Sequence, residues 1–218
     1  PNYFDLDEFE YSDKKEDYFL FVGRVYDGKG LNIAIQATHA IGAKLKVAGQ
    51  LAGHYADPEF KWPSHVEFVG YVGIKERKDL MKGAIASFLP SMYVEPFGGV
   101  QIENLLCGTP TITTDWGAFT ENNIEGVTGY RCRTFHEFVV AAHNCRKGKI
   151  KSIDCRNHGE KFSLENIAPR YEKFFNYVVN INHGKGWYNI DDISIYDEQY
   201  LANDRGLNSD GTPLEKKS

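Results

Sequence analysis

Short apolar runs alternate along this chain with longer amphipathic stretches. Apolar runs that end or begin at Gly or Pro predict buried strands at residues 17–23, 43–49, 65–70, 85–90 and 110–114. Helical spacing of apolar residues predicts helices at residues 30–42, 75–84, 99–107, 134–148 and 163–181. Strands that alternate with helices predict an α/β fold with a doubly wound, mostly parallel sheet, whose ligands bind at the carboxyl ends of the strands.

The last predicted helix contains Pro169, and we expect the helix to begin there because proline is favoured in a helix's first turn. Beyond Gly186 the periodicity is lost and the closing residues are polar, so we expect partial disorder. The chain begins with Pro1 rather than Met, and we expect it to be part of a longer protein.

The composition is that of a globular protein, with 42% hydrophobic and 14% aromatic residues. The net charge is −5, but both ends are acidic and the body between residues 18 and 190 is mildly basic. Such a body suits a small anionic ligand better than a nucleic acid, which favours a denser basic stripe. An equally compatible interpretation of this charge distribution is that the acidic ends only keep the termini solvated.

The cysteines carry no metal-finger or CxxC spacing and are interpreted as reduced thiols of a cytoplasmic protein. No apolar run approaches the roughly 20 residues that cross a bilayer. We therefore expect no transmembrane segment, which leaves peripheral membrane contact of the longer protein open.

Residues 22–31, "VGRVYDGKGL", predict a phosphate-binding turn. A strand ends at Gly23, and a helix starts near Gly30, where free N–H groups attract phosphate. Arg24 and Lys29 flank the turn and form a suitable clamp for a diphosphate. The loop is neither a Walker A motif nor the Rossmann GxGxxG fingerprint, and surface loops often hold one Arg and one Lys.

Residues 94–110, "VEPFGGVQIENLLCGTP", place two carboxylates around a strand-to-helix connection. Glu95 precedes Pro96 and is expected in the loop, while Glu103 is expected on the following helix. Gly98 and Gly99 let the backbone approach a ligand closely. Carboxylates accept hydrogen bonds from sugar hydroxyls, although acids near a helix N-terminus are also favoured by the helix dipole alone.

The same run resembles the E-x7-E signature of retaining glycosyltransferases of family 4, which have the GT-B fold. The matching positions are Glu95, Pro96, Phe97, Gly98, Glu103, Gly108 and Pro110, with Asn104 where that family usually has Ala. Residues 1–9, 21–30, 65–72 and 114–132 resemble further segments of the family in the same order.

The resemblance implies three segments. Residues 1–16 would be an interdomain linker, residues 17–182 a Rossmann-like nucleotide-sugar-binding domain, and residues 183–218 a partly disordered C-terminal extension. The chain would be the C-terminal, donor-binding half of a GT-B fold, and an N-terminal acceptor-binding domain would be missing from it.

The resemblance also implies roles for single residues. Arg24 and Lys29, with Gly23 beside them, would hold the diphosphate of a UDP- or GDP-linked sugar, and Glu95 would bond hydroxyls of the transferred sugar. Glu103 would bond the ribose. Backbone groups of Phe97, Gly98, Gly99 and Val100 would line the sugar and phosphate, and the base would lie near Val69, Gly70 and Tyr71.

The implied reaction is sugar transfer with retention at the anomeric carbon, without a metal or a further cofactor. This fragment alone is expected to be inactive without the N-terminal domain. The alternative is a non-catalytic nucleotide-sugar-binding module. An epimerase is less favoured, because the chain lacks GxxGxxG and Y-x-x-x-K motifs. Trp116 would either stack on a sugar or base or have a packing role only.

Overall fold

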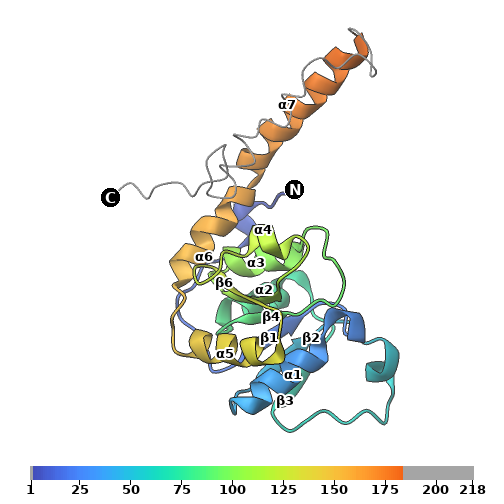
Figure 1. The fold of residues 1–218 in the computed structure, drawn as a ribbon, viewed down its shortest axis with the longest axis vertical. Coiled ribbons are helices and arrows are strands. Elements are labelled where there is room, and N and C mark those ends of the chain that lie inside the picture. Colours follow the sequence, from blue (N-terminus) through green and yellow to red (C-terminus); the bar gives the residue numbers. More distant parts are fainter. Residues whose placement is uncertain (1, 184–218) are drawn as a thin grey trace. The chain divides into compact units, whose positions relative to one another are not determined.

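The computed structural model describes residues 2–183, and the chain divides into two compact units, residues 1–164 and residues 165–218. The first unit contains a six-stranded sheet with helices around it (Figure 1). Its strands are β1 (Phe19–Val22), β2 (Leu45–Ala48), β3 (Val66–Gly70), β4 (Ser87–Leu89), β5 (Thr111–Thr114) and β6 (Gly129–Cys132). The helices are α1 (Leu31–Ala40), α2 (Ile74–Gly83), α3 (Gly99–Leu106), α4 (Phe119–Asn122), α5 (Phe135–Arg146) and α6 (Ser152–Gly159), with short 3-10 turns η1 (Leu6–Glu8), η2 (Asp27–Lys29), η3 (Gly53–Ala56) and η4 (Glu160–Phe162).

The strand order is β3-β2-β1-β4-β5-β6, and every neighbouring pair is parallel. Helices α1 and α5 pack together on one face of the sheet, and α2, α3 and α6 cover the other (Figure 1). The predicted doubly wound α/β sheet is therefore confirmed. The chain winds outward from β1 in one direction and then from β4 in the other, which places a topological switch point between these two strands.

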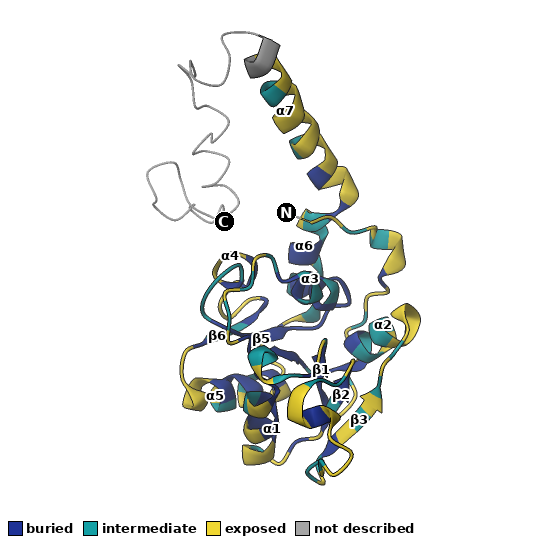
Figure 2. Ribbon diagram, turned by 90° about the vertical axis from the view of Figure 1, so that its right-hand side faces the viewer, coloured by how far each residue is buried: buried dark blue, intermediate teal, exposed yellow. Residues whose placement is uncertain are grey.

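The central strands are buried on both faces, as apolar runs in parallel sheets predict. All residues of β1, β4 and β5 are buried. Figure 2 shows this burial in the strands, while the outward faces of α1 and α5 are exposed. The largest fully buried side chains include Phe19 and Phe88, whose ring centroids lie 5.7 Å apart.

The N-terminal segment also contributes to the core of the first unit. Phe9 is buried, and Phe4 donates its backbone N–H to the carbonyl of Phe162 over 2.9 Å. Leu164 in turn donates its N–H to the carbonyl of Phe4. The segment predicted as a linker is thus joined to the domain through its main chain and its aromatic rings.

The structure contains elements that the hydrophobic pattern did not predict, namely β6, α4 and α6. Strand β6 is short and includes Gly129 and the partly exposed Arg131, so it lacks the continuous apolar run that identifies a buried strand. Helix α6 has a weak apolar face, with Cys155 and Gly159 among its buried residues. Its sequence therefore carries little helical periodicity.

Helix α7 (Leu164–His183) lies almost entirely in the second unit. It begins at Leu164, so the prediction that the helix begins at Pro169 is wrong. Pro169 lies inside the helix, near its N-terminus. A proline there removes only one main-chain hydrogen bond, the one that its missing N–H would donate to residue 165.

The predictions for the chain beyond Gly186, and for most of the extension at 183–218, fall outside the described residues. In the part of the chain that is described, no helix combines the length and apolar character that crossing a membrane demands.

Candidate functional site

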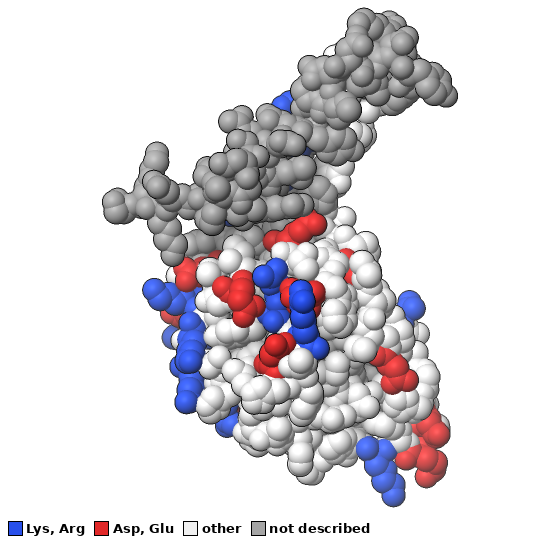
Figure 3. Space-filling model, viewed as in Figure 1, with Lys and Arg blue, Asp and Glu red and all other residues white. Residues whose placement is uncertain are grey.

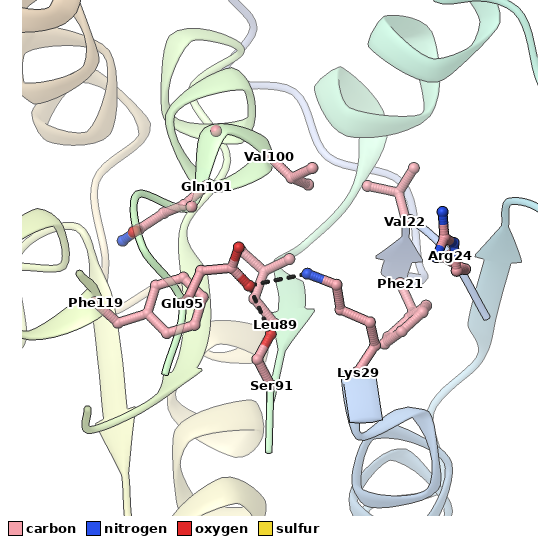
Figure 4. A pocket seen from close by; sticks show the side chains of 13 residues that line it. Phe21, Val22, Arg24, Lys29, Leu89, Ser91, Glu95, Val100, Gln101 and Phe119 are labelled. Atoms are coloured by element: carbon pink, nitrogen blue, oxygen red, sulfur yellow. Dashed lines mark hydrogen bonds and ion pairs between the residues drawn. The ribbon is translucent and has the colours of Figure 1, made fainter. Parts of the chain in front are cut away.

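A cavity of about 230 Å³ lies at the carboxyl edge of the sheet, at the switch point between β1 and β4 (Figure 4). Doubly wound sheets bind their ligands at this position. Its lining comes from the ends of β1 and β4, the loops that follow them, the start of α3, and α4. The lining residues are Phe21, Val22, Gly23, Arg24, Lys29, Leu89, Ser91, Glu95, Gly98, Gly99, Val100, Gln101 and Phe119.

Lys29 and Glu95 form an ion pair across this cavity. The Lys29 Nζ lies 2.9 Å from Glu95 Oε2, and Ser91 Oγ donates a hydrogen bond to the same oxygen over 3.1 Å (Figure 4). Lys29 also lies over the ring of Tyr93, with its Nζ 4.7 Å from the ring centroid. Lys29 ends η2 after β1, and Glu95 follows β4. The fold thus joins residues that are far apart in the sequence.

This network determines the charge of both groups. Burial raises the pKa of Glu95, but hydrogen bonds from its neighbours, Lys29 first, outweigh burial and lower it. Burial likewise lowers the pKa of Lys29, but hydrogen bonding with Tyr93 and Glu95 raises it overall. The side chains are 28% exposed for Lys29 and 14% for Glu95. Both groups are therefore charged at neutral pH.

The N-terminus of α3 forms another wall of the cavity through Gly99 and Val100. The first N–H groups of a helix have no partner within the helix and attract anions. Gly98 precedes the helix with φ of 79°, and an added Cβ would lie 2.9 Å from Phe119 Cε1. Only glycine fits this left-handed position against the ring without strain.

Arg24 lines the cavity from the β1 side and is exposed. Among residues 2–183, its guanidinium forms no ion pair with a carboxylate. Figure 4 shows Arg24 on the far side of Val22 from Glu95, whereas the Lys29 ammonium points at Glu95. The two predicted cations therefore differ: Lys29 is paired with Glu95, and Arg24 is available to a ligand.

Glu103 lies on α3 but is not part of the cavity lining. Its Oε1 accepts a hydrogen bond from Arg77 Nη2 over 2.9 Å, and its side chain is 14% exposed. Burial raises the pKa of Glu103, and the charges of Arg77 and Lys78 offset this only in part. Arg77 was not predicted as a site residue, because a single arginine on a polar helix carries no pattern that separates it from a solvated residue.

The residues predicted to contact a base lie at the end of the edge strand β3. Tyr71 is 84% exposed and Val69 is also exposed. Neither these residues nor Gly70 line the cavity. The structure therefore places them at the same carboxyl edge, two strands away from the switch point.

Phe97 does not line the cavity. Its ring stacks on Phe4 with centroids 6.5 Å apart and meets Phe162 edge-on at 5.7 Å. Its carbonyl accepts a hydrogen bond from Asn122 Nδ2 over 2.6 Å. The Phe97 side chain thus anchors the loop that carries Glu95.

The loop after β5 supports the Glu95 loop from a second side. Trp116 Nε1 donates hydrogen bonds to the carbonyls of Ser91 and Tyr93 over 3.1 and 3.2 Å. Ala118 donates its N–H to the carbonyl of Glu95 over 2.9 Å. These contacts show the packing role considered for Trp116. Ser91 and Tyr93 were not predicted as site residues, although Ser91 directly follows Pro90, which ends the predicted strand, and Tyr93 lies in the same loop.

On the face shown in Figure 3, Lys and Arg side chains near the centre lie among Asp and Glu side chains, and others follow one edge. The described His, Cys, Asp and Glu side chains form no group of three or more suited to hold a metal ion.

Residues 4–141 match the family described as "Glycosyl transferases group 1". The chain is 36% identical over 125 residues to a glycogen synthase of Mycobacterium tuberculosis, which covers 52% of this chain and 29% of that protein. It resembles AviGT4, a glycosyltransferase involved in avilamycin A biosynthesis, with a TM-score of 0.69 and 26% identity over 81% of this chain and 56% of that one. The Anabaena protein Alr3699/HepE, solved with UDP-glucose, shares the fold at a TM-score of 0.67 and 20% identity, over 80% of this chain and 56% of that one. The matched part of this chain thus spans 56% or less of the length of each of these relatives.

Proposed function

The chain belongs to the glycosyl transferases group 1 family and has the fold of the C-terminal half of a GT-B enzyme, and we propose that it binds the donor of a retaining glycosyltransferase. The donor is a nucleotide-diphosphate sugar, and the sugar passes to an acceptor with retention at the anomeric carbon. A further domain of a longer protein would hold the acceptor, since the match covers only part of each relative.

One observation carries the proposal. Two cations, one carboxylate and a helix N-terminus surround a single cavity at the switch point of the sheet. A sugar diphosphate presents two kinds of group to such a cavity, namely anionic phosphates and hydroxyls. Cations and helix N–H groups bind the first, and carboxylates accept hydrogen bonds from the second.

The phosphates would lie between the cations and α3. Breaking the glycosidic bond places additional negative charge on the leaving diphosphate, and preorganised donors stabilise that charge. Arg24 is available for this contact, and the N–H groups of Gly99 and Val100 approach from the opposite wall. Lys29 adds a second cation. In this proposal the side chains and helix supply the positive charge, so transfer needs no metal.

The two glutamates would bind the two polyhydroxylated ends of the donor. Glu95 lines the cavity and would accept hydrogen bonds from the transferred sugar. Glu103 lies next to α2, which begins three residues after Tyr71. It would bind the ribose, and the base would contact Val69, Gly70 and Tyr71. The UDP-glucose bound by the Anabaena protein of the same fold supports this class of donor.

Isothermal titration of the chain with UDP, GDP, ADP and their glucose conjugates tests the proposal. We expect saturable binding of one nucleotide, and a loss of about 1.5–3 kcal/mol in Arg24→Ala, because hydrogen bonds to charged groups have this value. Arg146→Ala is the matched control, since Arg146 contacts the carbonyl of Ile41, beyond the far end of α1. Wild-type protein that binds none of these ligands would contradict the proposal.

Assays of sugar release then separate the proposal from the alternative of a non-catalytic binding module. A longer protein that contains this chain should consume the donor that binds. If it binds the donor and neither transfers nor hydrolyses the sugar, the binding-module alternative is correct.

A further inference from the structure

The ion pair between Arg77 and Glu103 joins two helices outside the cavity. Arg77 lies on α2 and Glu103 on α3, and these helices pack together. The side chains are 32% and 14% exposed. A partly buried pair of this kind is held more firmly than a surface pair, because solvent screens it less.

The pair leaves hydrogen-bonding capacity unused. Glu103 Oε2 and Arg77 Nε are buried and have no hydrogen-bond partner within residues 2–183. An ionised carboxylate offers about four acceptor positions, and the contact with Arg77 Nη2 fills one of them. Buried polar atoms normally have a partner. The unfilled positions therefore indicate a ligand that donates hydrogen bonds to this carboxylate.

The surroundings of Glu103 favour Arg77 as the group that keeps it ionised. Lys78 is the other nearby cation, and its Nζ pairs with Glu8 Oε2 over 2.8 Å. Glu8 itself opposes the charge of Glu103, as does burial. Among residues 2–183, Arg77 is thus the cation in direct contact with Glu103. The ionised carboxylate is an acceptor at both oxygens, whereas protonation turns one oxygen into a donor.

The position of Arg77 connects two of the proposed subsites. It lies in the first turn of α2 and donates its backbone N–H to the carbonyl of Gly73 over 2.9 Å. The end of β3 with Tyr71, where the base is proposed to bind, comes directly before this helix. The helix that follows the proposed base end of the site therefore supplies the side chain that contacts the carboxylate on α3.

We infer that Arg77 is a positioning residue for the ribose of the donor. Its guanidinium holds Glu103 through Oε1 and keeps the carboxylate ionised, so that the remaining acceptor positions take the ribose hydroxyls. This inference rests on the proposed function, and it adds a residue that contacts Glu103 and no substrate atom.

The test compares ribose with a sugar that lacks both hydroxyls. UDP, GDP and ADP are titrated together with their 2′,3′-dideoxy counterparts and with inorganic pyrophosphate. For the nucleotide that binds, the wild type should prefer the ribose form by about tenfold or more. Arg77→Gln should reduce this preference to about threefold or less and leave pyrophosphate affinity unchanged, while Arg77→Lys should restore part of it.

Two controls test whether the effect of Arg77→Gln is specific to its contact with Glu103. Lys78→Gln removes a cation from the next residue of the same helix and should keep the wild-type preference, because Lys78 pairs with Glu8. In a Glu103→Gln background, Arg77→Gln should cause no further change in the preference. This second comparison also detects a general folding defect, which would lower pyrophosphate affinity and the melting temperature in every background.

The outcomes are distinct. An unchanged ribose preference in Arg77→Gln, or an equal loss for pyrophosphate, overturns the inference and leaves the proposed function intact. A wild type that binds pyrophosphate but no nucleotide, or nothing at all, overturns the proposed function together with the inference.

Discussion

Glu95 and Glu103 belong to one motif and have equally exposed side chains, at 14% each, yet the structure surrounds them differently. Glu95 Oε2 has two partners, Lys29 and Ser91, and its pKa is lowered. Among residues 2–183, Glu103 has one hydrogen-bond partner, Arg77, and its Oε2 has none, and its pKa is raised. Burial raises the pKa of both carboxylates, and the net shifts differ in direction because hydrogen bonds outweigh burial at Glu95 but the nearby cations do not outweigh it at Glu103.

The difference shows which groups a ligand must displace. At Glu95 two hydrogen bonds already reach Oε2, so a ligand that binds through this oxygen must compete with Lys29 and Ser91. At Glu103 the carboxylate retains free acceptor positions, so a ligand adds hydrogen bonds without displacing one. A ligand at Glu95 Oε2 therefore replaces an existing hydrogen bond, whereas a ligand at Glu103 adds a hydrogen bond to an acceptor that has none among the described residues.

Gly117→Ala should disturb the Glu95 end most strongly. Gly117 has φ of 61°, and an added Cβ would lie 2.7 Å from the carbonyl oxygen and 2.8 Å from the nitrogen of Glu95. We expect a loss of about 2–4 kcal/mol in the free energy of unfolding, from the left-handed backbone and this backbone clash. Urea denaturation measures it.

Gly126→Ala is the matched control for this substitution. Gly126 has φ of 72°, but nothing lies within 4 Å of its added Cβ. It should therefore cost only about 1–2 kcal/mol, the contribution of the left-handed conformation. Equal losses in the two variants would show that the contact with Glu95 contributes nothing.

Glu95→Gln should strengthen the binding of the bare nucleoside diphosphate more than that of its sugar conjugate. The substitution removes a negative charge beside the proposed diphosphate position and frees Lys29, so the bare nucleoside diphosphate should bind more tightly by about 1 kcal/mol. The sugar conjugate should lose about 1 kcal/mol relative to this, because its hydroxyls lose an ionised acceptor. Titration of both ligands measures the change, and weaker binding of the bare nucleotide would exclude competition for Lys29.

Some parts of the fold and of the candidate site could be predicted from the sequence because they depend on local sequence patterns, and others could not because they depend on tertiary contacts. The parallel sheet and the loop positions of Arg24, Lys29 and Glu95 follow from apolar runs that end at Gly or Pro, because these signals are local. The Lys29–Glu95 pair depends on two loops that meet only through the sheet topology. Arg77 depends on the packing of α2 against α3. Such contacts are set by tertiary structure, and no local spacing encodes them.

The stabilities of Glu95→Gln and Glu103→Gln should depend on pH with opposite signs. The lowered pKa of Glu95 stabilises the fold above the unfolded value of 4.5, and this contribution is lost as the pH falls through the folded pKa. Glu95→Gln should thus cost about 1 kcal/mol at pH 7 and less at pH 4.

For Glu103 the folded pKa lies above 4.5, so its contribution is fully present below that value and is lost as the pH rises. Glu103→Gln should therefore be more destabilising at pH 4 than at pH 7. Urea denaturation of the wild type and both variants at the two pH values gives the comparison. Parallel pH profiles for the two variants would mean that both carboxylates experience the same environment.

Ser91→Ala should have the smallest effect and should act at the Glu95 end alone. Ser91 is buried and donates the second hydrogen bond to Glu95 Oε2. Its loss should cost about 0.5–1 kcal/mol of stability, since Lys29 still holds the oxygen. In a Glu95→Gln background the cost should shrink, because the acceptor is then no longer charged. Hydrogen bonds from Lys29, Tyr93 and Ser91 all lower the pKa of Glu95. If the cost of Ser91→Ala is the same in both backgrounds, Ser91 stabilises the loop independently of the carboxylate, and Lys29 and Tyr93 alone lower that pKa.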